Sequence, residues 1–193
     1  HLNAVNNSES LRDIYSKFLP EIISLSNKFG QSKIIYNSLV KLKETNNFDQ
    51  IKNRILDKEI LEMQHRGISL QKNDQEEFNN ISEKLGKLST DFSNNVLDAT
   101  NKWFLILNKK SEVDGLPERV LELMAISAHN HLKKDEEVDI KNGPWKLSLD
   151  IPTYTSFMTY ATDRNLREKL YKAFVGRASQ GEKNNSQIIE EIL

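Results

Sequence analysis

The sequence predicts a mostly α-helical protein: a multi-helix array around one long helix of about residues 71–102, with a small two-stranded antiparallel β element. Apolar residues recur at alternating steps of three and four along most of the chain, as they do on one face of an amphipathic helix. The pattern in residues 71–102 is long enough for one helix of roughly 45 Å. Two short segments, about residues 103–107 and 145–149, break this period and indicate strands.

Three helices are predicted before the long one. Ser8 is suited to cap the first, which reaches Gly30. Pro20 falls inside that pattern, where its missing N–H predicts a kink rather than two helices. The second helix covers about residues 32–43 and the third about residues 48–66. Because the loops between them are short, we expect antiparallel neighbours that lie along the long helix as an up-and-down array.

Apolar side chains on these helices are expected to face a common core. On the first helix they are Leu11, Ile14, Phe18, Ile22, Leu25 and Phe29, and on the second Ile35, Leu39 and Leu42. On the long helix they are Phe78, Ile81, Leu85, Leu88, Phe92 and Ala99, interrupted only at Asn95. Leu88 and Phe92 lie near the middle of this seam, so the pattern predicts that both are buried.

The two predicted strands differ in pattern. Residues 103–107 are apolar on both faces, as in a fully buried strand, whereas residues 145–149 alternate and would leave one face in water. Their similar lengths favour pairing, with an unpaired edge through which the chain would self-associate. Between them, Pro117 is suited to the first turn of a helix that reaches about His131, and Lys133–Gly143 reads as a charged loop.

Two more helices are predicted after the second strand. Pro152 cannot donate to a strand ladder, so we expect the strand to end there and a helix to cover about residues 153–160. Thr162 or Asp163 would cap the next helix. Its inward-facing residues are Leu166, Leu170, Ala173 and Phe174.

Composition limits the function. The 193 residues carry 27 Lys and Arg against 28 Asp and Glu, so neither nucleic acid nor a membrane surface is an expected partner. There is no cysteine, which fits a reducing compartment, and no long apolar run, so we expect a soluble cytoplasmic protein. The amphipathic pattern continues to Leu193. We therefore expect a single helical fragment of a longer protein, with a helical array over residues 1–102 and the β element plus C-terminal helices over residues 103–193.

The histidines do not form a metal site by their spacing. Glu62 and His65 are three residues apart on one helix face, as in di-iron bundles, but no second pair of this kind occurs and an exposed polar pair is the favoured interpretation. His129 and His131 point to different sides of a helix, and His1 stands alone.

The remaining candidates also favour structural roles. Trp103 and Trp145 are interpreted as core residues rather than a stacking platform for a ligand. Asp150 and Tyr154 are interpreted as a local hydrogen-bonded corner beside a proline rather than a catalytic pair. We assign no catalytic, cofactor-binding or metal-binding residue in this chain.

Several stretches nevertheless resemble one family. They are His1–Ser8, Phe92–Thr100 running into Trp103, Leu149–Tyr154, Phe157–Tyr160, Leu166–Glu168 with Tyr171, and Arg177–Ser179. In this order and spacing they resemble the N-terminal and middle part of the thimet oligopeptidase family of zinc metallopeptidases. The charged residues between Lys133 and Lys141 carry no motif of that family.

The resemblance implies a mostly helical peptidase whose deep channel admits short peptides. In that family, two histidines of an H-E-x-x-H helix and a later glutamate hold zinc, and that motif is absent from this sequence. The chain would then be a non-catalytic segment of the channel wall on which the remainder of the enzyme packs, and by itself it would neither hold zinc nor cleave peptides. The alternative is an autonomous helical scaffold or protein-interaction module without enzymatic activity.

Overall fold

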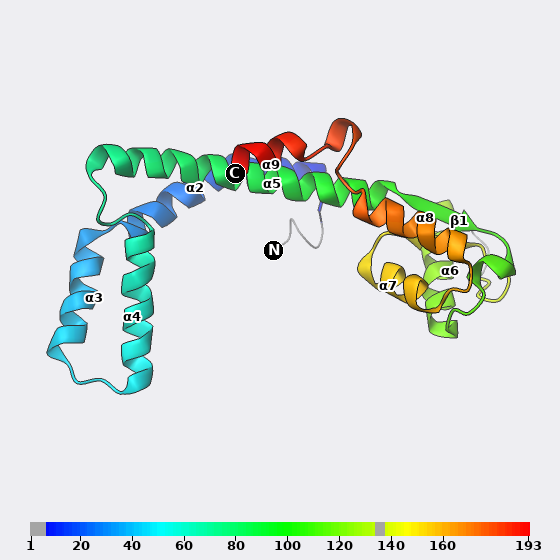
Figure 1. Ribbon diagram of the computed structural model, residues 1–193, viewed down its shortest axis with the longest axis horizontal. Coiled ribbons are helices and arrows are strands. Elements are labelled where there is room, and N and C mark those ends of the chain that lie inside the picture. Colours follow the sequence, from blue (N-terminus) through cyan, green and yellow to red (C-terminus); the bar gives the residue numbers. More distant parts are fainter. Residues whose placement is uncertain (1–6, 134–137) are drawn as a thin grey trace. The chain divides into compact units, whose positions relative to one another are not determined.

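The computed structural model describes residues 7–133 and 138–193. Within these ranges the chain forms eight α-helices and one two-stranded antiparallel sheet, which confirms the predicted fold class (Figure 1). His1 and part of the charged loop, residues 134–137, lie outside the described residues. The chain divides into two compact units, residues 1–90 and 91–193, and the boundary falls inside the longest helix.

The first three described helices begin within two residues of the predicted starts. They are α2 (Glu9–Gly30), α3 (Lys33–Thr45) and α4 (Gln50–His65). Ser8, Ser32 and Asp49 cap them, and each side-chain oxygen accepts a backbone N–H three residues further on. Pro20 lies inside α2, which continues past it as one helix.

The helices of the first unit do not form an up-and-down array along the long helix, so that prediction is wrong. Helices α3 and α4 pack against each other as a hairpin that extends away from the first half of α5 (Figure 1). The joint is polar. Gln31 donates to the backbone oxygen of Arg66 at 2.9 Å and to Oδ1 of Asn79 at 2.8 Å, while Arg66 donates to Oγ of Ser26 at 2.7 Å. These polar contacts lie beside two buried apolar side chains, Met63 at 6% and Ile68 at 5% exposed, and together they set the direction of the hairpin.

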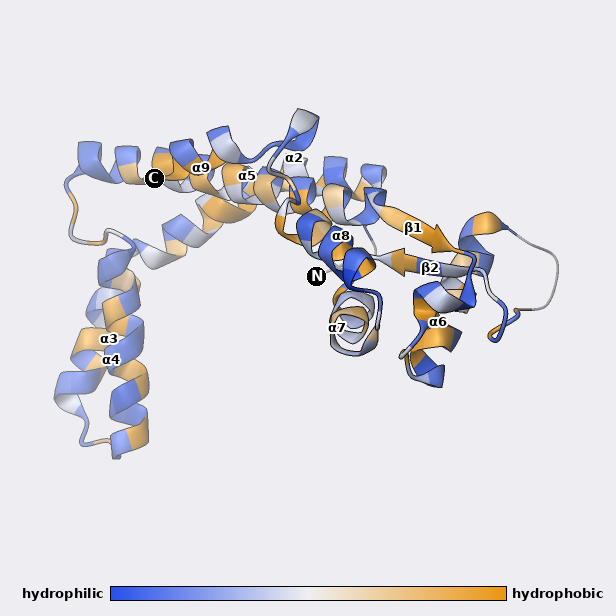
Figure 2. Cartoon of the chain, turned by 45° about the vertical axis from the view of Figure 1, so that its right-hand side comes forward, coloured by the Kyte–Doolittle hydropathy of each residue, from blue (hydrophilic) through white to orange (hydrophobic). Residues whose placement is uncertain are grey.

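The apolar faces of α2 and α3 are largely exposed, contrary to expectation. On α2, Phe18 is 46%, Ile22 58% and Leu25 57% exposed, and on α3 Ile35 and Leu42 are exposed as well. Helical periodicity determines which face of a helix is apolar, but burial requires a second element to cover that face. Figure 2 shows these apolar stretches on both helices.

The long helix α5 spans Lys72–Lys102, as predicted, and is about 46 Å long. None of its residues is fully buried. Leu88 and Phe92 are half-buried, so the prediction that both lie in the core is wrong. The seam is present in the sequence, but the described elements of each unit cover it only in part.

The sheet pairs β1 (Phe104–Leu107) with β2 (Trp145–Ser148), antiparallel as predicted. Strand β2 alternates between buried and half-exposed residues, as expected. Strand β1 is buried only at Leu107, so the prediction of a fully buried strand is wrong. The register places Lys146 beside Ile106 and Ser148 beside Phe104, so this face mixes polar and apolar side chains, and the Phe104 ring contacts Lys146 and His131.

The core of the second unit lies beneath the other face of the sheet. It combines buried side chains from the strands, from α6 (Glu118–Leu132), α7 (Ile151–Tyr160) and α8 (Arg164–Val175), and from the loops between them. The largest fully buried side chains are Met124, Trp145, Leu147, Leu149, Phe157 and Leu170. Leu166, Ala173 and Phe174 pack against this cluster, which confirms the predicted inner face of α8.

In the second unit, two helix starts differ from the prediction. Pro117 is the residue before α6 rather than part of its first turn. Pro152 lies in the first turn of α7, where its missing N–H costs nothing, so α7 starts two residues earlier than expected. Asp150 caps α7 by accepting the N–H of Thr153 at 3.0 Å, and a last short helix, α9 (Ser186–Ile192), follows α8. Over the described ranges, no helix is both long and apolar enough to span a bilayer.

Candidate functional site

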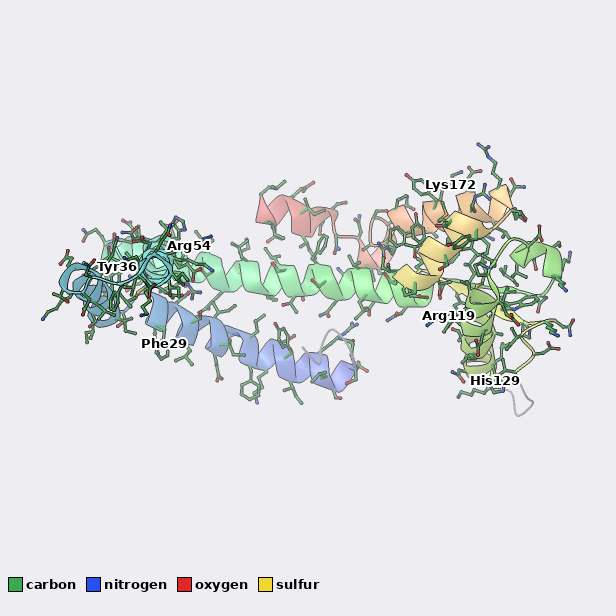
Figure 3. All side chains as sticks on the ribbon, turned by 90° about the horizontal axis from the view of Figure 1, so that it is seen from below. Phe29, Tyr36, Arg54, Arg119, His129 and Lys172 are labelled. Atoms are coloured by element: carbon green, nitrogen blue, oxygen red, sulfur yellow. The ribbon has the colours of Figure 1, made fainter. Side chains whose placement is uncertain are left out.

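A cavity of about 890 Å³ opens in the second unit. It lies between the end of α5, the C-terminal half of α8 and the segment of residues 176–185 that follows α8, which we call the strap. Its lining residues include Asp98, Lys102, Trp103, Leu149, Lys172, Ala173, Arg177, Glu182 and Lys183. Figure 3 marks Lys172 on α8.

Polar contacts hold the strap against α5. Arg177 Nη1 donates to Oγ1 of Thr100 at 3.3 Å, and Lys183 forms an ion pair with Asp98 at 3.1 Å. These contacts come from both ends of the strap, so the wall of the cavity is positioned from two sides.

Asn185, at the end of the strap, is only 3% exposed, and both its side chain and its backbone N–H form hydrogen bonds. Its Oδ1 accepts a hydrogen bond from Nδ2 of Asn95 at 2.9 Å, and its Nδ2 donates to the backbone oxygen of Phe92 at 3.2 Å. Its backbone N–H donates to the oxygen of Ala178 at 2.8 Å, across the strap. A buried amide that uses both ends of its side chain in this way fixes one arrangement, because any other leaves a buried polar group unpaired.

The strap also contains strained backbone. Ala178 is 7% exposed and adopts a left-handed conformation with φ of +52°, which is unfavourable for a residue with a Cβ atom. The surrounding contacts therefore hold Ala178 in place. Gly181, with φ of +72°, allows the chain to turn back towards α5.

The cavity lining carries more positive than negative side chains, and two of the cations are paired. Lys183 pairs with Asp98, and Lys172 pairs with Glu168 one turn earlier on α8. Hydrogen bonding to Lys172 and its charge hold the pKa of Glu168 below the ordinary value. Lys102 has no ion pair among the residues that the structure describes.

The histidine candidates lie apart from the cavity. Glu62 lies on α4 and forms an ion pair with Lys58 at 3.7 Å, and His65 is the exposed last residue of that helix. His129 and His131 lie in the last turn of α6, where His131 contacts the ring of Phe104 edge-on with centroids 4.3 Å apart. In the ranges 7–133 and 138–193, no group of three His, Asp or Glu side chains is arranged to hold a metal ion.

The two tryptophans differ in their surroundings. Trp145 is 1% exposed in the core, and its indole N–H donates to the oxygen of Ile140 at 3.1 Å, which confirms its structural role. Trp103 packs partly against the core but also lines the cavity.

Asp150 and Tyr154 form the local corner that the sequence predicts. The backbone N–H of Tyr154 donates to the oxygen of Asp150, and the Tyr154 ring stacks on Phe174 with centroids 3.8 Å apart. Burial raises the pKa of Asp150, but hydrogen bonds from Ser148 and Thr153 outweigh it and leave the pKa below the ordinary value. The carboxylate is therefore used to cap a helix.

Apart from Trp103, which was interpreted as a core residue rather than a stacking platform, the residues that shape the cavity were not singled out as site candidates from the sequence. One signal was visible, because Asn95 interrupts an otherwise apolar seam, and a polar residue at such a position needs a polar partner. The partner, Asn185, lies 90 residues away, and only the tertiary structure identifies it.

The described architecture is that of a mostly helical segment, and comparison with known proteins identifies its class. Residues 1–75 match the family model described as "Neurolysin/Thimet oligopeptidase, N-terminal domain". The chain is thus similar to the thimet oligopeptidase family. The similarity extends beyond the matched domain, because curated relatives align with the whole chain.

Among these relatives is the Arabidopsis thaliana protein named "Probable cytosolic oligopeptidase A", which is 39% identical over 196 residues. The "Organellar oligopeptidase A, chloroplastic/mitochondrial" of the same plant is also 39% identical, and "Oligopeptidase A" of Haemophilus influenzae is 35% identical over 201 residues. Each alignment covers 100% of this chain but only 28%, 24% and 28% of the respective relative. The chain thus spans about a quarter of the length of these proteins.

Proposed function

We propose that this chain is a non-catalytic segment of a zinc oligopeptidase that hydrolyses short peptides, and that it forms part of the wall of the substrate channel. The observation that carries the proposal is the similarity of the whole chain to oligopeptidases A that are about four times as long. A segment of this size supplies packing and channel surface, while the chemistry resides elsewhere in the longer protein.

The residues present do not fit a zinc site. A catalytic zinc ion needs about three protein ligands that converge on one point. Of the three described histidines, His65 on α4 belongs to the first unit, and His129 and His131 on α6 belong to the second. No group of three metal-binding side chains occurs in the described part of the chain. We therefore assign no catalytic step to this segment.

The exposed apolar faces support a role as part of a larger assembly. On α2, the side chains of Ile14, Phe18, Ile22, Leu25 and Phe29 are all between 46% and 61% exposed. Figure 3 labels Phe29 near the C-terminal end of this helix. A row of apolar side chains this long is unusual on a free surface and is typical of a surface that another element covers. We assign the part that covers the apolar face of α2 to the remainder of the longer peptidase.

The test compares two proteins: the chain of 193 residues, and a version extended along its reading frame to the length of the relatives. Each is assayed for zinc content and for cleavage of a quenched fluorescent peptide. We expect zinc and chelator-sensitive cleavage in the extended version alone. Cleavage by the chain itself would contradict the assigned division of roles. An early stop codon after Leu193, or inactivity of both proteins, would favour the autonomous helical scaffold.

A matched pair of variants tests the cover on α2. Ile22→Gln removes an apolar side chain that is 58% exposed in the chain, so it should change the stability of the chain by less than about 0.5 kcal/mol. In the extended protein the same change should cost about 2 kcal/mol or more, because the side chain would then be buried. Lys17→Gln, at an exposed position of the same helix, should be neutral in both proteins. Equal effects of Ile22→Gln in both proteins would mean that nothing covers this face.

We further propose a cytoplasmic location. The absence of cysteine fits a reducing compartment. The similarity does not discriminate between compartments, because the cytosolic and the organellar relative are equally identical to this chain. Cell fractionation followed by detection of the protein tests the location, and recovery in an organelle fraction would contradict it.

A further inference from the structure

We infer that the cavity beneath the strap is a binding site for a carboxylate group, held by Arg177 and Lys102. This inference goes beyond the proposed function and does not depend on it, since it rests only on the contacts and charges around the cavity. The two cations come from different walls: Lys102 is the last residue of α5, and Arg177 lies at the start of the strap.

Arg177 is oriented before any ligand arrives. Its guanidinium carbon lies 3.6 Å from the centroid of the Phe174 ring, and its Nε donates to the backbone oxygen of Phe174 at 2.8 Å. Tyr154 stacks on the same ring at 3.8 Å. Because two groups this close to one centroid must occupy opposite faces, Phe174 is held between them. With Nε used for the backbone and Nη1 weakly bonded to Thr100, the guanidinium keeps donors for a ligand, and its planar fork matches a carboxylate.

The charge balance favours a monoanion. After the pairs Lys183 with Asp98 and Lys172 with Glu168 are set aside, the lining retains Lys102 and Arg177 against Glu182. The remaining balance is one positive charge. A carboxylate compensates this charge, whereas a phosphate dianion would exceed it and would be repelled by Glu182.

Apolar side chains line part of the cavity. Trp103, Leu149 and Ala173 line the cavity, and apolar neighbours strengthen a charge-assisted hydrogen bond by lowering the local dielectric constant. The volume of about 890 Å³ lies in the range of sites that enclose small organic ligands. The ligand is therefore a carboxylate that carries apolar groups, and its source is either the C-terminus of a peptide or an acidic side chain.

The experiment titrates the chain with three probes: acetylated trialanine with a free C-terminal carboxylate, the same peptide as its amide, and an amidated peptide with a central glutamate. Fluorescence of Trp103 reports binding, because Trp145 is buried in the core. We expect binding of at least one carboxylate-bearing probe, weakened by added salt, and none of the amidated trialanine. Preference for the free C-terminus or for the glutamate identifies the source.

Variants test the two named cations. Arg177→Gln and Lys102→Gln should each weaken binding about tenfold, as the loss of a charge-assisted hydrogen bond does. Arg177→Lys keeps the charge and should weaken binding less, and Glu182→Gln should strengthen it, so the inference stays testable even if Arg177→Gln unfolds. Lys169→Gln, on α8 but outside the lining, is the matched control and should change binding by less than about twofold.

Three results would overturn the inference. The first is that none of the probes binds at about 10 mM, a concentration above the dissociation constant of a weak site. The second is equal binding of the acid and the amide. The third is that inorganic phosphate competes better than the carboxylate probes, which would show that the site selects a dianion.

Discussion

The hydrogen-bonded pair of Asn95 and Asn185 provides the sharpest test of how the second unit is held together. Asn185→Ala removes two side-chain hydrogen bonds, one from Asn95 and one to the oxygen of Phe92, at a residue that is 3% exposed. Each bond contributes about 1 kcal/mol net, and the amide of Asn95 is then left without its partner. We expect Asn185→Ala to lower the free energy of unfolding by about 2 to 3 kcal/mol.

A double-mutant cycle isolates the pair. Asn95→Ala should cost less than Asn185→Ala, because it removes one bond and alanine is the better helix former. If the two side chains interact as the structure indicates, the two changes together should cost at least about 1 kcal/mol less than the sum of the single changes. Asn101→Ala, at an exposed position of α5, is the control and should be neutral or slightly stabilising.

Urea denaturation followed by tryptophan fluorescence is the appropriate assay. Both tryptophans, Trp103 and Trp145, belong to the unit of residues 91–193, so their fluorescence reports that unit, while far-ultraviolet circular dichroism reports the helices of both units. A coupling energy within about 0.3 kcal/mol of zero, the usual error of additivity, would refute the role assigned to the pair.

Three further predictions concern a core residue, a helix cap and a turn of the second unit. Leu170→Ala, at a side chain with no exposed surface, should cost about 2 to 5 kcal/mol in tryptophan-monitored urea denaturation. Leu88→Ala, at a half-buried position of the first unit, should cost clearly less when unfolding is followed by far-ultraviolet circular dichroism; equal costs would contradict the burial of the two side chains. Asp150 has a lowered pKa in the folded state, so its contribution to stability is present above its ordinary pKa of 3.8 and is lost as the pH falls through the lower folded value. Asp150→Asn should therefore make the free energy of unfolding of the second unit depend less on pH between about pH 5 and pH 2. An unchanged pH dependence of unfolding in this range would contradict this. Gly115→Ala should cost about 2 kcal/mol or more in the same assay, because φ is +86° and the added Cβ would meet a backbone oxygen at the end of α7; a neutral result would mean that this turn adapts freely.

Local features of the sequence were sufficient to predict where the helices and the strands lie. A cap such as Ser8 or Asp163 bonds to a backbone N–H two or three residues away, so its effect is contained in a few neighbouring residues. The same holds for the alternation in β2, which follows from the two-residue period of a strand. The error at Pro152 was also local, since proline is compatible with both the end of a strand and the first turn of a helix.

Burial and the cavity depended on contacts between distant parts of the chain. Periodicity placed Ile22 and Leu88 on apolar faces, but whether those faces are covered depends on other elements, which leave Ile22 exposed and Leu88 half-buried. The sequence by itself determined where each helix runs and which of its faces is apolar, because both follow from interactions within a few residues. Only the tertiary structure decided that Asn95 contacts Asn185 and that Arg177 lies over Phe174 in the wall of a cavity. These contacts form only when the strap folds back against α5, and α5 is about 80 to 90 residues earlier in the sequence.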